Sequence, residues 1–139
     1  MDGTLLAFFA GILIVGILLI VVITITNKRP AQLDVDKYRS KWLTIEQQLK
    51  RDEVSSYHMA VLNADKLLDQ ALRERAIKGE TMGERMKTVR DTWSNANAVW
   101  SAHKLRNQIA HESDARVSYD DARRALAGFK QALKDVGAI

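Results

Sequence analysis

The feature that most constrains this chain is an uncharged apolar run at residues 4–26, built mostly of Leu, Ile, Val and Phe. No charged side chain occurs between Asp2 and Lys28. At about 1.5 Å per residue, a helix over this run is roughly 34 Å long, enough to cross a hydrocarbon core of about 30 Å. The run therefore predicts a membrane-spanning helix in contact with lipid.

A cleaved signal peptide is the alternative interpretation of the same run. Such a peptide has a basic start, a shorter apolar core and a cleavage site of small residues. Here the start carries Asp2 and no Lys or Arg, and the run ends without an Ala-x-Ala pattern. We therefore predict an uncleaved anchor over residues 1–27.

The charges beside the run predict its orientation. Lys28 and Arg29 follow it directly, and all 21 lysines and arginines lie after it. Because basic residues are retained on the cytoplasmic side, we expect a single-pass protein of the inner (plasma) membrane, with its N-terminus outside and its C-terminal domain in the cytoplasm. The absence of Cys agrees with a reducing compartment. The mild excess of positive charge permits contact with RNA or anionic lipid.

The remaining chain, roughly 105 residues, is long enough for one small core. We predict a linker at residues 28–33, followed by a helical domain at 34–139. Two apolar series with helical spacing begin this domain, and their phase changes at residues 50–53. Asp34 and Asp52 are the predicted N-caps of these two helices. The first series comprises Val35, Tyr38, Trp42, Ile45 and Leu49, and the second Val54, Tyr57, Val61, Ala64, Leu68 and Ala71.

The second of these helices is predicted to end at Gly79. Asp65, Lys66 and Asp69 are assigned to its solvated face.

Three further helices follow. Thr81 and Glu84 have the spacing of a capping box, which opens a short helix. A longer uninterrupted helix is expected at about residues 95–110. Ser118 and Asp121 repeat the capping spacing before the last helix. Alternating strand patterns and hairpin dipeptides do not occur. The sequence therefore predicts an all-α protein, in which an N-terminal transmembrane helix precedes a four- to five-helix bundle.

The helix at about residues 95–110 has two unlike faces. Its apolar face lies within an arc of roughly 60°, and its polar side carries imidazole, guanidinium and carboxamide groups together. On the polar side, Arg106, Asn107 and His111 have the order Arg-Asn-x-x-x-His. The apolar positions are Ala98, Ala102, Leu105 and Ile109.

This motif resembles that of the HEPN superfamily, small helical domains of which many are metal-independent ribonucleases with an Arg-polar-x(3–5)-His motif. The resemblance covers about residues 34–137 and leaves out the apolar run. It implies a HEPN-like bundle that binds RNA or a nucleotide and cleaves RNA by acid–base chemistry. It also implies a homodimer in which two copies of the motif share one cleft.

The chemistry of RNA cleavage suits these residue types. Arg106 can hold a phosphate through two donors, and His111 can transfer a proton near neutral pH. We therefore assign Arg106 and His111 as the catalytic candidates. No metal or other cofactor is expected, because no Cys is present and the two histidines of this helix lack a third ligand nearby. The supporting or RNA-binding candidates are Asn107, His103, Lys104 and Trp100.

A structural interpretation of the same residues remains open. Arg106 can pair with Glu112 or Asp114, and His111 can interact with the C-terminal end of its helix. The corresponding function is a non-catalytic, membrane-tethered interaction or scaffold module. The sequence leaves the choice between an RNA-cleaving domain and such a module undecided.

Overall fold

The computed structural model describes residues 2–26 and 31–139. The chain separates into two compact units, Met1–Ala31 and Gln32–Ile139. The described ranges contain helices and no strand, so the expected all-α class is confirmed. The predicted basic flank at Lys28 and Arg29, and most of the predicted linker, lie outside the described residues.

The first unit is a single helix, α1 (Gly3–Thr26). None of its residues is buried, and the large apolar side chains from Leu5 to Ile25 are exposed all around the helix. Its backbone groups are satisfied inside the helix, so an apolar solvent can surround it without cost to the hydrogen bonds. By length and composition, α1 can span a membrane.

The second unit begins with α2 (Val35–Gln48) and α3 (Val54–Glu74). Asp34 caps α2 as predicted, because its carboxylate accepts the backbone N–H of Lys37 at 3.1 Å. The predicted cap at Asp52 is wrong, since the N-cap position of α3 is Glu53 and no side chain bonds there.

The predicted end of α3 at Gly79 is also wrong. The helix ends at Glu74, because Ala76 adopts a left-handed conformation with φ 56°. Ile77 N–H then bonds back to the carbonyl of Leu72 at 3.0 Å, which closes the helix end.

Both predicted capping boxes are confirmed. In the first, Thr81 and Glu84 open α4 (Met82–Thr88), a short helix followed by the 3₁₀ turn η1 (Arg90–Thr92). In the second, Ser118 and Asp121 open α6 (Tyr119–Asp135). Between them lies α5 (Ala96–His111), which is capped by Asn95 and matches the helix predicted at about 95–110.

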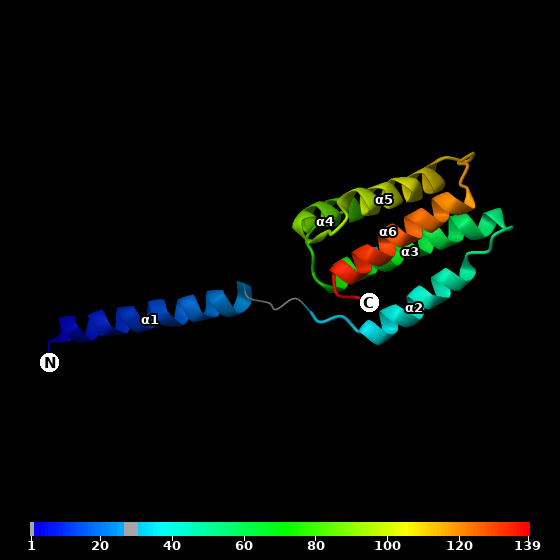
Figure 1. Cartoon of the computed structure of the whole chain (residues 1–139). Helices are drawn as coiled ribbons and strands as arrows, with labels where there is room; N and C mark the ends of the chain where they lie inside the picture. Colours follow the sequence, from blue (N-terminus) through cyan, green and yellow to red (C-terminus); the bar gives the residue numbers. More distant parts are fainter. Residues whose placement is uncertain (1, 27–30) are drawn as a thin grey trace. The chain divides into compact units, whose positions relative to one another are not determined.

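Helix α3 is the centre of the bundle, and α2, α5 and α6 all pack against it (Figure 1). Its buried face is mostly apolar, with Ser56, Tyr57 and Asp65 as the buried polar residues, and it packs on the apolar face of α6, where Phe129 is fully buried. Helix α5 approaches α6 closely at Gly128, where an added Cβ would lie 2.8 Å from the carbonyl oxygen of Ala98. This close approach fixes the position of α5 beside α3 and brings the predicted motif next to the second half of α3.

Candidate functional site

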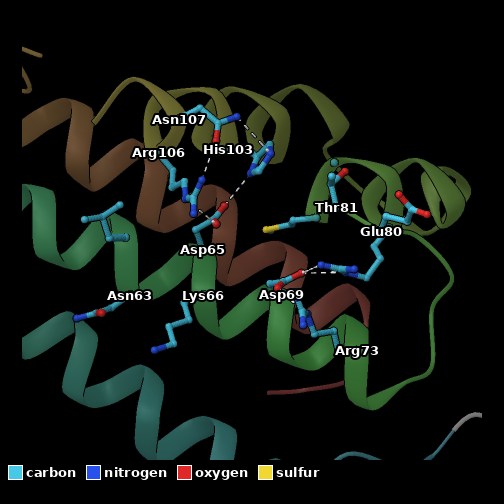
Figure 2. A pocket seen from close by; sticks show the side chains of 14 residues that line it. Asn63, Asp65, Lys66, Asp69, Arg73, Glu80, Thr81, His103, Arg106 and Asn107 are labelled. Atoms are coloured by element: carbon cyan, nitrogen blue, oxygen red, sulfur yellow. Dashed lines mark hydrogen bonds and ion pairs between the residues drawn. The ribbon is translucent and has the colours of Figure 1, made fainter. Parts of the chain in front are cut away.

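A polar pocket of about 630 Å³ lies where α3, α5 and the start of α4 meet (Figure 2). Helix α5 contributes three of the residues singled out in the sequence, and the opposite wall carries two carboxylates of α3. The polar residues that contact one another in this pocket are Asp65, Asp69, Arg73, Arg85, His103, Arg106 and Asn107.

Asp65 is the most buried carboxylate of this pocket, with 3% of the residue exposed. Its Oδ1 lies 2.8 Å from His103 Nδ1, and its Oδ2 lies 3.2 Å from Arg106 Nε. The assignment of Asp65 to a solvated face is therefore wrong. Helix α5 covers this part of α3, and its two polar side chains offset the cost of burying the carboxylate.

Two further contacts close a ring of polar groups around Asp65. Arg106 Nη1 donates to Asn107 Oδ1 at 2.9 Å, and Asn107 Nδ2 lies 3.4 Å from His103 Nε2. Figure 2 shows the side chain of Asp65, from α3, pointing toward those of His103 and Arg106, from α5, with Asn107 beside them. We call Asp65, His103, Arg106 and Asn107 the Asp65 network.

A second carboxylate, Asp69, lies one turn further along α3. Its Oδ1 accepts hydrogen bonds from Arg85 Nε at 2.9 Å and Nη2 at 2.7 Å, and its Oδ2 accepts one from Arg73 at 2.9 Å. Arg85 also donates to the carbonyl of Gly79 at 2.7 Å, and its side chain is 5% exposed. We call Asp69 and Arg85 the Asp69 pair, which ties α3 to α4.

The structure places the predicted site residues unevenly. Arg106, Asn107 and His103 line the pocket, whereas His111 is exposed at the last position of α5 and is not among the lining residues. The alternative in which Arg106 pairs with Glu112 or Asp114 is not what the structure shows, because the ion pair of Arg106 is with Asp65.

The other two candidates also lie away from the pocket wall. Trp100 is partly buried against the core, and its ring meets that of His103 edge-on at 6.2 Å between centroids. Lys104 belongs to a different depression, a groove of about 820 Å³ between α5 and α6. The residues that line this groove include the small residues Ala98, Ala125 and Gly128, the last two of them buried, and exposed polar residues such as Lys104 and Gln108.

Asp65, Asp69 and Arg85 are parts of the pocket that the sequence interpretation missed. A signal for Asp65 does exist in the sequence. It is preceded by Ala64 and followed after one residue by Leu67, and these two residues are 0% and 4% exposed. A helix with apolar residues over so wide an arc is buried on more than one side, and a carboxylate inside that arc needs a partner.

Comparisons with protein-family models, with curated proteins and with solved structures gave no match to this chain. The site therefore has to be interpreted from its own geometry. Within residues 2–26 and 31–139, no cluster of three or more His, Cys, Asp or Glu side chains is placed to hold a metal ion.

Proposed function

We propose that the chain is a membrane-anchored, HEPN-like domain that binds single-stranded RNA along α5 and cleaves it without a metal. The observation that carries this proposal is the meeting of His103, Arg106 and Asn107 on the wall of an open polar pocket. Imidazole, guanidinium and carboxamide together supply the proton transfer and the anion binding that phosphodiester cleavage requires.

Arg106 is the proposed phosphate ligand. Its Nε is directed to Asp65 and its Nη1 to Asn107, which hold the guanidinium plane in one orientation. No bond of its Nη2 is found within the described ranges, and the side chain is 36% exposed. A preorganised guanidinium with an available donor binds a phosphate oxygen at little entropic cost.

His111 is the proposed proton donor, and it lies one turn beyond Asn107. His103, Asn107 and His111 occur at intervals of four residues, so they follow one side of α5 at steps of about 6 Å. Because His111 is exposed at the end of this stripe, an RNA strand lying along α5 can reach it.

A homodimer belongs to the same proposal. His103 and His111 are separated by about 12 Å along the helix axis, too far for both to act on one phosphate. A second chain packed across the polar side of α5, beside the groove between α5 and α6, would bring its own His111 to the pocket. Two anchors in one bilayer raise the local concentration of the domains and favour this pairing.

The orientation proposed for the anchor places the α2–α6 bundle in the cytoplasm, where RNA is present. It rests on the basic residues after the apolar run. A reporter fused after Ile139 that works only in the cytoplasm is expected to be active. Strong activity of a periplasm-only reporter at this position would reverse the orientation.

The test of cleavage uses the full chain in lipid nanodiscs and a single-stranded RNA with a fluorophore and a quencher, in EDTA. Wild type is expected to cleave this RNA and His111→Ala is expected to abolish cleavage. Arg39→Ala is the control, because Arg39 is an exposed cation of α2 outside the pocket. Cleavage that survives His111→Ala would remove the proposed role of His111.

A non-catalytic interaction module is the second candidate, and the groove between α5 and α6 favours it. Its lining of small apolar residues together with polar ones suits a helix of a partner protein. If the chain is such a module, Arg106→Ala is expected to change the stability of the domain, because the bond to Asp65 is lost. RNA binding is then expected to be absent in both wild type and variant.

A further inference from the structure

We propose that His103 is the general base of the cleavage reaction and that Asp65 is the residue that positions it. This inference rests on the proposed function and adds to it a second imidazole, buried in the pocket rather than exposed at the helix end. The His103 side chain is 12% exposed and that of Asp65 is 4% exposed.

The hydrogen-bond ring of the Asp65 network determines where the proton of His103 resides. An arginine can only donate, so Asn107 Oδ1 must be the acceptor of Arg106 Nη1. The other end of the Asn107 amide is then NH₂, a donor, and it faces His103 Nε2. Nε2 must therefore accept, and the ring hydrogen lies on Nδ1, where it is donated to Asp65 at 2.8 Å.

This tautomer leaves the basic nitrogen, Nε2, on the side of the pocket. Both Gly83 and Asn107, the neighbours of Nε2, line the pocket. Gly83 has no side chain, and a Cβ built on it would lie 3.9 Å from Nε2, so the space in front of the nitrogen is open. The 3.4 Å separation from Asn107 is long for a hydrogen bond, and a substrate hydroxyl can replace the amide as donor.

The ligand that fits these groups is a ribonucleotide with its 2′-hydroxyl at Nε2 and its 3′-phosphate at Arg106. Nε2 takes the proton of the 2′-hydroxyl while O2′ attacks phosphorus, so that the O2′–P bond forms and the P–O5′ bond breaks. The leaving O5′ takes a proton from the His111 imidazolium of a second chain, and the two imidazoles exchange protons with solvent afterwards. The products are a 2′,3′-cyclic phosphate and a 5′-hydroxyl, and no redox step or metal is required.

Asp65 acts through His103 in this scheme. Its carboxylate fixes the ring and favours the imidazolium that forms when Nε2 takes the proton. Asp65→Asn replaces one oxygen by NH₂, which faces either the donor of Arg106 or the donor of His103. In either orientation a donor faces a donor, so the ring of hydrogen bonds is broken and the tautomer of His103 is no longer fixed.

The kinetic test compares His103→Gln and Asp65→Asn with wild type in nanodiscs, using the quenched RNA in EDTA. We expect kcat of His103→Gln to fall about 10²- to 10⁴-fold, and the acidic limb of the pH profile of kcat/KM to disappear. We expect KM to change less than about threefold, because the base acts only in the transition state. His58→Gln, which removes an imidazole of α3 outside the pocket, is the matched control and is expected to keep kcat within about twofold.

A second measurement tests the tautomer of His103 independently of the kinetics. Long-range ¹⁵N–¹H spectra of the full chain are expected to show His103 as the Nδ1–H tautomer in wild type and to lose this signature in Asp65→Asn. If wild type cleaves RNA and His103→Gln cleaves it equally well, the base is not His103, while the proposed function stands. If wild type shows no cleavage, both fail. An Nε2–H tautomer in wild type would overturn the role of Nε2 whatever the kinetics.

Discussion

Asp65 and Asp69 lie one turn apart on α3, and both carboxylates face guanidinium groups, yet their surroundings differ. Asp69 is bonded to two arginines, and Arg85 uses its remaining donor on the carbonyl of Gly79. Asp65 is bonded to one arginine and one imidazole, and the imidazole presents a second nitrogen to the pocket.

The two sites differ in how exposed the partners of the carboxylates are and in how many of their donors are bonded to protein acceptors. The Arg85 side chain is 5% exposed, and its Nε, Nη1 and Nη2 all donate to protein acceptors, so the Asp69 pair holds α3 to α4. In the Asp65 network, Arg106 and His103 both line the pocket, and no bond of Arg106 Nη2 is found within the described ranges. The same carboxylate chemistry on neighbouring turns thus supports the fold in one case and the proposed reaction in the other.

The largest effect is expected from breaking the Asp69 pair. Arg85→Ala leaves the carboxylate of Asp69 partly buried with only the exposed Arg73 as partner, and it removes the bond to the loop at Gly79. We expect a loss of about 3 kcal/mol in the free energy of unfolding, measured by urea denaturation of the full chain in detergent.

Arg73→Ala is the control for this variant, because it removes the exposed partner of the same carboxylate. Its side chain is 64% exposed, so we expect a loss below about 1 kcal/mol. Equal losses in the two variants would mean that burial does not distinguish the two arginines.

The second effect comes from the contact that positions α5. In Gly128→Ala, the new methyl group would lie 2.8 Å from the carbonyl oxygen of Ala98, so α5 and α6 must separate. We expect a loss of about 2 kcal/mol, typical of overpacking. Because α5 supplies the partners of Asp65 and not those of Asp69, the Nδ1–H signal of His103 should broaden while the Nε–H signal of Arg85 stays unchanged. Perturbation of both signals would contradict the separation of the two sites.

The helix starts of this protein could be predicted because their signals are local. Asp34, Thr81 and Ser118 each cap a helix through a backbone N–H three residues away, and such spacing is visible in the sequence. The failures have local causes as well. Asp52 lies one residue before the N-cap position of α3. The end of α3 depends on the left-handed conformation of Ala76, whereas the sequence pattern predicts the helix end at Gly79.

The candidate site was predictable only on α5. The motif residues Arg106 and Asn107 share one helix, so their proximity follows from helical spacing. The partner of Arg106 is on α3, and the contact of Asp65 with His103 joins residues 38 positions apart. Two carboxylates near the end of the same helix, Glu112 and Asp114, were equally plausible partners in the sequence. Only the packing of α5 on α3 distinguishes Asp65 from them.

A substitution at Gly83 is expected to change the free energy of unfolding and RNA cleavage in opposite directions. Gly83→Ala puts a methyl group 3.9 Å from His103 Nε2 and 3.9 Å from Thr81 Oγ1, distances of ordinary van der Waals contact. Since Ala favours the helix over Gly, we expect the free energy of unfolding to rise by up to about 0.5 kcal/mol. The methyl group nevertheless occupies the space of the substrate hydroxyl, so RNA cleavage should fall while thermal stability does not. A variant that loses stability and activity together would show that the space at Gly83 is required for folding.

A small effect that depends on pH is expected from a carboxylate that lies outside both sites. Hydrogen bonds from Ser118, and then the ion pair with Arg124, lower the pKa of Asp121 below its usual value of 3.8. A carboxyl group whose pKa is lowered on folding stabilises the protein above its unfolded pKa, and this contribution is lost as the pH falls through the folded value. The Asp121 side chain is 40% exposed, so solvent screening limits the contribution, and we expect Asp121→Ala to cost less than about 1 kcal/mol at pH 7. The difference from wild type should shrink as the pH is lowered below 3.8.

Asp120→Ala, a change at the exposed neighbouring position, serves as the control. A difference for Asp121→Ala that stays constant down to the acid limit of folding would show that the carboxylate charge contributes nothing to the start of α6.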